Sequence, residues 1–246
     1  MQKIGLATSL PILWGEGDDP REWLASGAPR SWAGDLLAGW GEIQPLDSLV
    51  DVQGRLPLPA DAMLVMAQPR PLTPQENLAL DAWVRGGGRL LLFVDPMLTQ
   101  PSRYSLGDPR RPQDMAMLSP ILAHWGLELQ FDPREKSGER LVVLGEASLP
   151  VNLPGRFHLL GISGDGTFDR GNGGTEPHSG SLGKSGDAAA SCKLESEGIL
   201  ANCGIGAGRV LALADAALFE EPSGRADRLL RRGALTALLS RLRRGD

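Results

Sequence analysis

The chain of 246 residues has few cysteines, histidines and aromatic residues, and it has no long apolar run. Cys192 and Cys203 are too few for a disulfide framework, so we expect two reduced, buried thiols, with a redox pair or a nucleophile as alternatives. The three histidines lie far apart and show no metal-ligand spacing. No segment approaches the roughly 20 apolar residues that a membrane-spanning helix needs. These absences predict a protein without metal, cofactor or membrane span.

Acidic residues outnumber basic ones by 30 to 25, so the formal net charge is −5, and aromatics make up only 5% of the residues. No basic stretch is interleaved with aromatics, so we expect no nucleic-acid partner. The first residues resemble a strand more than a cleaved signal peptide. With reduced thiols, this predicts a cytoplasmic protein that is associated with a membrane only through a partner.

The length suits a single α/β domain over residues 1–246. Glycine and proline are abundant, at 32 and 19 residues, and predict long connections. Residues 163–187 are almost all Gly, Ser, Asp, Thr and Asn, and the segment cannot bury enough apolar surface to order itself. We expect it to be a flexible loop.

Residues 62–96 determine the expected fold. Two wholly apolar strands, 63–67 and 90–94, enclose a helix that begins at Thr73 and Pro74 with Glu76 three residues after Thr73, a capping box. Three glycines at 86–88 end that helix. Strands without alternation are covered on both faces, as in parallel sheets. The unit predicts a flavodoxin-like α/β fold with a mostly parallel central sheet flanked by helices.

The remaining elements are read from the same patterns. Strands are expected at 3–7, 42–49, 127–131, 140–144, 155–162 and 210–214, helices at 31–40, 113–125 and 226–242, and a C-terminal β-hairpin at 190–202.

Four motifs in order resemble the soluble domain of auxiliary proteins found with ABC-type transport systems, of which the gliding-motility component is the familiar member. They are PLTPQE at 71–76 with the glycines at 86–88, the apolar strand ending in DP at 90–96, HWGLEL at 124–129, and GAGRV at 206–210 with its strand ending at Asp215. The resemblance implies a fold like that of class I glutamine amidotransferases. It also implies partners, namely the membrane or ATPase components of an ABC transporter.

The chain departs from this pattern in two ways. Gliding-motility members carry transmembrane segments, and this sequence shows none. The amidotransferase nucleophile would be a Cys in the turn after a core strand, where this chain has Asp95, Pro96 and Met97. We therefore expect a non-enzymatic accessory subunit. The alternatives are an amidotransferase-like hydrolase, using Ser9, Asp95 or Cys203, and a small-ligand or sugar-binding module.

Ligands of open parallel sheets bind beyond the carboxyl ends of the strands. We therefore expect a ligand or partner in a cleft formed by seven residues there: Thr8, Ser9, Trp14, Glu16, Gln68, Asp95 and Asp215. Acidic side chains are present and basic ones are absent, which favours a cation, an amine or a hydroxyl-rich molecule over a phosphate. Alternatively, Asp95 and Asp215 only cap their own loops by accepting hydrogen bonds from backbone amides.

Overall fold

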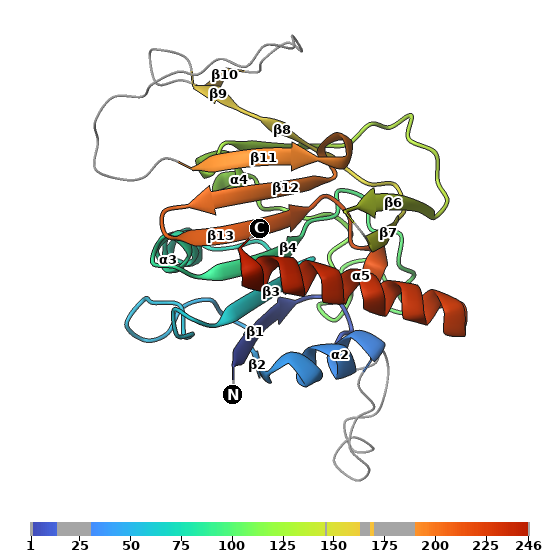
Figure 1. Ribbon diagram of the computed structural model, residues 1–246, viewed down its shortest axis with the longest axis horizontal. Helices are drawn as coiled ribbons and strands as arrows, with labels where there is room; N and C mark the ends of the chain where they lie inside the picture. The colour runs from blue at the N-terminus through green and yellow to red at the C-terminus, as the bar shows by residue number, and fades with distance from the viewer. Residues whose placement is uncertain (1, 14–30, 146, 163–167, 170–189, 246) are drawn as a thin grey trace.

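The computed structural model describes residues 2–13, 31–145, 147–162, 168–169 and 190–245 (Figure 1). Its centre is a seven-stranded sheet in the order β11-β12-β13-β4-β3-β1-β2. The strands are β1 (Lys3–Thr8), β2 (Glu42–Pro45), β3 (Met63–Ala67), β4 (Arg89–Phe93), β11 (Ser191–Glu195), β12 (Leu200–Ile205) and β13 (Gly208–Leu213). The five strands from β13 to β2 are parallel, and β11 and β12 extend the sheet with antiparallel pairs. A mostly parallel central sheet is therefore confirmed.

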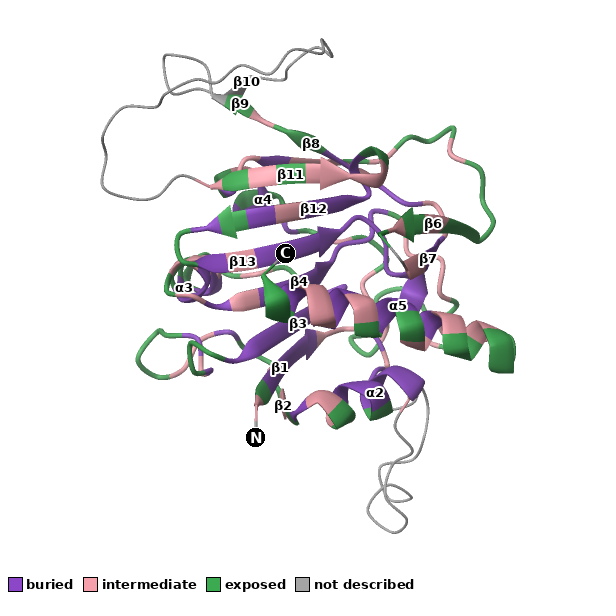
Figure 2. Ribbon diagram, viewed as in Figure 1, coloured by how far each residue is buried: buried purple, intermediate pink, exposed green. Residues whose placement is uncertain are grey.

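Helices cover both faces of this sheet. One face packs on α2 (Trp32–Trp40) and α5 (Arg225–Arg244), and the other packs on α3 (Pro74–Arg85) and α4 (Ser119–His124). Figure 2 shows the central strands almost wholly buried between these layers. Burial on both faces explains why β3 and β4 are apolar at every position in the sheet interior instead of alternating.

The capping box at the start of α3 forms as the sequence predicts. The Thr73 hydroxyl accepts a hydrogen bond from the backbone N–H of Glu76, and the Glu76 carboxylate accepts one from the backbone N–H of Thr73. Glu76 also pairs with Arg70 at 2.6 Å and accepts from the backbone N–H of Leu49. These contacts hold the pKa of the buried Glu76 carboxyl at about 2, against the opposing effect of desolvation. The start of α3 thereby fixes the segment that follows β2.

Two predicted elements are shorter in the structure. The helix expected at 113–125 is only α4 (Ser119–His124), because Pro120 has no N–H to donate and is tolerated only in a first helical turn. The strand expected at 42–49 ends at Pro45, after which the chain turns toward Glu76.

Three further strand pairs form small sheets that the sequence predicted only in part. The smaller sheets pair β5 (Leu127–Gln130) with β8 (Arg156–Leu159), β6 (Arg140–Leu144) with β7 (Ala147–Val151), and β9 (Gly161–Ile162) with β10 (Phe168–Asp169). The short helices η1 (Ser196–Gly198) and η2 (Ala217–Phe219) follow β11 and β13. Apart from β10, the loop predicted at 163–187 lies outside the described residues.

Among the described residues, no helix combines the length and the apolar character that crossing a membrane requires.

Gly208, at the start of β13, allows the strand to approach the end of α3. A Cβ atom there would lie 1.9 Å from the carbonyl oxygen of Val84 and 2.5 Å from that of Gly88. Both contacts are with backbone, so the strand would have to move. We expect Gly208→Ala to lower the free energy of unfolding by about 2 kcal/mol in urea denaturation. Gly204→Ala on the adjacent strand is the control, because a Cβ there meets nothing within 4 Å. Equal stability of the two variants would contradict this packing.

Candidate functional site

The structure brings together the predicted site residues that it describes. Thr8 ends β1 and Ser9 follows it, Gln68 follows β3, Asp95 follows β4 and Asp215 follows β13. Parallel strands end at one edge, so these residues share that edge of the sheet. Trp14 and Glu16, the other two members of the predicted cleft, lie outside the described residues.

Asp95 and Asp215 are buried under the edge, with 0% and 2% of their surface exposed. The Asp95 carboxylate accepts hydrogen bonds from the backbone N–H groups of Met97 and Ala216. That of Asp215 accepts from the backbone N–H groups of Asn152 and Ala217. All four carboxylate oxygens therefore bind backbone amides, which is the loop-capping arrangement that was the alternative to a ligand role.

The two carboxyl groups titrate abnormally because they are buried near each other. Desolvation raises the pKa of Asp95 to about 6, against the hydrogen bonds from Met97 and Ala216. Desolvation first, and then the charge of Asp95, raise the pKa of Asp215 well above its ordinary value. Burial therefore makes both carboxyl groups easier to protonate than an exposed aspartate.

Gln68 and Ser9 connect the ends of β1 and β3 to the loop after β4. The Gln68 side chain accepts from the Asp95 N–H and donates to the carbonyl oxygens of Asp95 and Gln113, at 2.9, 3.0 and 2.8 Å. The Ser9 hydroxyl donates to the Gln68 carbonyl oxygen at 2.5 Å and accepts from the Gln113 N–H at 3.0 Å. Both backbone polar groups of Gln113 are therefore hydrogen-bonded, and this holds the loop after β4 at the carboxyl edge of the sheet.

A crevice of about 350 Å³ opens at this edge between the ends of β1 and β3. Thr8 and Ser9 line it, whereas Gln68, Asp95 and Asp215 are buried beside it. Its charged lining residues are Asp47, Arg70, Arg110 and Arg111. None of the seven residues expected to form the cleft is basic, but three arginines from two other loops line this crevice beside Thr8 and Ser9.

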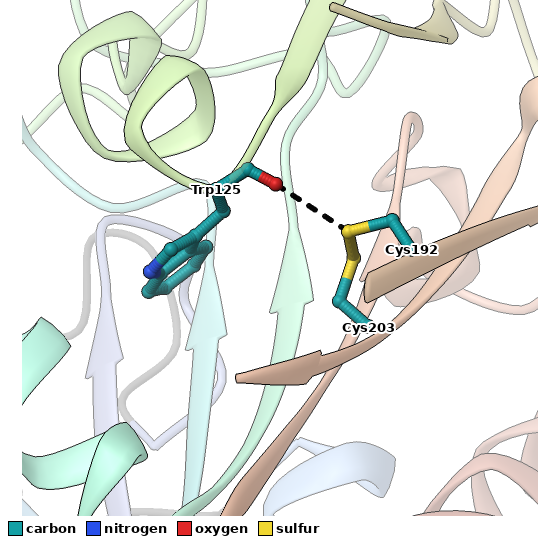
Figure 3. Close-up of a disulfide and its surroundings, with 3 residues drawn as sticks. All are labelled: Trp125, Cys192 and Cys203. Carbon is teal, nitrogen blue, oxygen red and sulfur yellow. Dashed lines mark hydrogen bonds between the residues drawn. A yellow bond between two sulfur atoms is a disulfide. The ribbon is translucent and has the colours of Figure 1, made fainter. Parts of the chain in front are cut away.

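The expectation of two reduced thiols is also wrong. Cys192 and Cys203 form a disulfide between β11 and β12, with their Cα atoms 4.0 Å apart (Figure 3). They occupy directly opposite positions of the antiparallel pair, which brings the side chains of facing residues close together. Figure 3 also marks the 3.5 Å contact of Cys192 Sγ with the Trp125 carbonyl oxygen. A disulfide sulfur has no hydrogen to donate, so we describe this as a packing contact.

Other chemistry is limited in the part of the chain that the structure describes. No group of three or more His, Cys, Asp or Glu side chains there is arranged to hold a metal ion. The Ser9 hydroxyl is hydrogen-bonded to backbone on both sides, and Cys203 is oxidised. Neither Ser9 nor Cys203 is therefore an activated nucleophile beside a base.

Comparison with known proteins gives one family. The model of the family described as an ABC-type uncharacterized transport system (ABC_transp_aux) matches residues 46–133. This region contains β3, α3, β4, α4 and β5, and with them the first three of the four motifs that carry the resemblance. Somewhat more than a third of the chain is therefore similar to auxiliary proteins of ABC transport systems. No curated protein matches the chain.

Solved structures resemble the chain only distantly. The exo-beta-1,4-mannosidase Op5Man5 from Opitutaceae bacterium strain TAV5 shares 13% identity over 98% of this chain and 34% of its own, with a TM-score of 0.43. Gan42B, a GH42 beta-galactosidase from G. stearothermophilus, shares 10% identity over 98% of this chain and 30% of its own, with a TM-score of 0.46. The chain spans about a third of the length of these enzymes, and such values carry over neither a fold nor an activity. The similarity that bears on function is that of residues 46–133 to the ABC transport-system family.

Proposed function

We propose that the chain is a non-enzymatic accessory subunit of an ABC-type transport system, which binds the membrane or ATPase components of the transporter. The match of residues 46–133 to the transport-system family carries this proposal. The motif at 206–215, outside the matched region, adds to it, because GAGRV forms the turn into β13 next to β4.

We further propose a flavodoxin-like topology for the domain. Its parallel strands run in the spatial order β2-β1-β3-β4-β13, which supports the proposal because flavodoxin-like sheets have the order 2-1-3-4-5. The antiparallel strands β12 and β11 continue this sheet beyond its last parallel strand.

The amidotransferase-like hydrolase gains no support from these residues. The turn after β4 carries Asp95, which is buried and binds two backbone amides. Cys203 is in a disulfide. The same disulfide favours a place outside the reducing cytosol over the cytoplasmic one that the sequence suggested, because disulfides persist in oxidising compartments.

The proposed function is tested by assembly. The full chain is co-expressed with the ATPase and permease of an ABC transporter from its source organism, and the membrane complex is purified in detergent through a tag on the permease. We expect the chain to co-elute in a fixed ratio to the permease. The control is an unrelated ABC transporter carrying the same tag. A chain that elutes alone in every combination, or equally with both transporters, would refute the proposal.

A further inference from the structure

The crevice at the carboxyl edge lies where the sheet changes winding direction. The chain leaves β1 toward β2 through α2 on one face, and it leaves β3 toward β4 through α3 on the other face. The loops after β1 and β3 therefore diverge, and the space between them is the topological switch point where open α/β sheets bind ligands. A volume of about 350 Å³ is within the range of small-molecule sites.

Each of the three arginines of the crevice pairs with a carboxylate. Arg70 pairs with Glu76 and Arg111 with Asp114, both at 2.6 Å, and Arg111 Nη1 also donates to the Tyr104 carbonyl oxygen at 2.8 Å. Arg110 binds Asp108 through Nε and Nη2, at 3.0 and 2.8 Å. Among the described residues that line the crevice, the arginines are present and these carboxylates are not. The guanidinium groups that line the crevice are therefore held in fixed orientations by their carboxylate partners.

Arg110 is the most available of the three. Its side chain is 68% exposed, and its guanidinium lies 4.4 Å from the centre of the Tyr104 ring. The contacts with Asp108 use Nε and Nη2, so they leave Nη1 for a further acceptor. A planar guanidinium held on one side by a carboxylate and on one face by an aromatic ring has lost much of its conformational freedom before a ligand arrives.

The loop that carries these arginines is itself held in place. Ser9 and Gln68 bind both backbone groups of Gln113, as described above. Gln68 adopts φ +45°, a left-handed conformation that costs energy for a residue with a Cβ and that persists where the surroundings impose it. Strained residues of this kind occur at ligand sites, and this one lies beside the crevice.

We propose that this crevice binds a small anionic molecule through a phosphate or carboxylate group, with Arg110 as the anion ligand and Arg111, already bound to Asp114 and to the Tyr104 carbonyl oxygen, beside it. The guanidinium fork matches the oxygens of both groups. Thr8, Ser9 and Asp47 provide acceptors for hydroxyl groups on the rest of the ligand, and Leu46, Leu49 and Leu72 provide an apolar wall. This inference goes beyond the transport-subunit proposal and does not depend on it.

The test measures binding of inorganic phosphate and of acetate to the full chain at constant ionic strength, by calorimetry and by the melting temperature. We expect a saturable rise in melting temperature with at least one of the two anions. Binding of phosphate without binding of acetate would identify a phosphate-bearing ligand. Binding of acetate, with or without phosphate, would show that the crevice accepts carboxylates. No saturable effect of either anion, beyond that of sodium chloride, would overturn the proposal.

Variants show whether the effect belongs to the crevice. Arg110→Gln together with Arg111→Gln should weaken anion binding at least about tenfold, because each charge-assisted hydrogen bond contributes strongly. The matched control is Arg134→Gln, since Arg134 binds Asp132 two residues earlier with the same geometry as Arg110 binds Asp108, away from the crevice. Equal loss in Arg134→Gln would overturn the assignment. If the double variant is destabilised without ligand, the single Arg110→Gln variant, at an exposed position, decides.

Discussion

The free energy of unfolding should rise by about 1 kcal/mol or more when the pH is lowered from about 7.5 to about 5.5. The origin is the buried pair of Asp95 and Asp215, whose pKa values are both raised in the folded state, that of Asp95 to about 6. An unfolded chain keeps both carboxyl groups near their ordinary pKa and binds almost no proton above about pH 5.5. The folded chain therefore binds more protons than the unfolded chain in this interval.

The direction follows from that difference. A group whose pKa is raised by folding stabilises the folded state fully below its unfolded pKa, and the contribution is lost as the pH rises through its folded pKa. Each extra proton changes stability by about 1.4 kcal/mol per pH unit. Carboxyl groups with lowered pKa, such as that of Glu76, act in the opposite direction only at pH values nearer their unfolded pKa. The interval above about pH 5.5 therefore separates the buried pair from these other carboxyl groups.

Asp215→Asn provides the decisive comparison. The substitution removes the titration of one of the two buried carboxyl groups and keeps its shape, so urea unfolding across this interval should show a smaller slope of stability with pH. Its cost is one backbone hydrogen bond, because an amide NH₂ replaces one of the two accepting oxygens. Asp132→Asn, at an exposed loop position, should leave the slope unchanged. A wild-type stability that is flat over this interval would show that the pair is not protonated.

Reducing the disulfide should lower the free energy of unfolding by about 3 kcal/mol, and the melting temperature by about 6–12 °C. The cross-link closes a loop between residues 11 apart in the sequence, and it limits the conformational freedom of the unfolded chain. The measurement is thermal unfolding of the protein with and without dithiothreitol, with the redox state checked by intact mass.

The double variant Cys192→Ala and Cys203→Ala distinguishes the effect of losing the disulfide from any other effect of dithiothreitol on stability. Its free energy of unfolding should be slightly lower than that of the reduced wild type, because removing the sulfur of the fully buried Cys203 leaves a small cavity. Dithiothreitol should not change its melting temperature. If the oxidised and reduced wild-type proteins melt at the same temperature, the disulfide makes no contribution to stability.

The sequence was sufficient for elements whose signals are local. The capping box at Thr73 and Glu76 and the apolar runs of β3 and β4 lie within a few residues of the structures they specify, and all form as expected. The predicted start of the next helix, at residue 113, was wrong. Pro120 allows a helix only in its first turn, and α4 begins at Ser119. The hairpin prediction stopped at residue 202, one residue before Cys203. Extending it would have placed the two cysteines opposite each other.

The crevice depends on contacts that no local pattern contains. Arg70 and Arg110 are 40 positions apart in the chain, and they meet because β3 and the loop after β4 end at the same edge. The hydrogen bond between Ser9 and Gln113 spans 104 positions. The burial of Asp95 and Asp215 likewise depends on η2 and on the segment after β7 closing over the strand ends. Strand-end position was therefore a correct guide to the location of these residues, but not to which of them face solvent.

The disulfide has a further consequence for how the outermost strand finds its place. A strand that slips by two residues keeps the same face toward the core, so hydrophobic burial discriminates poorly against it. Such a slip of β11 along β12 would place Cys192 opposite Ala201 or Ile205, where no sulfur is available. The disulfide can therefore form only in the observed register. Once formed, it prevents β11 from shifting along β12.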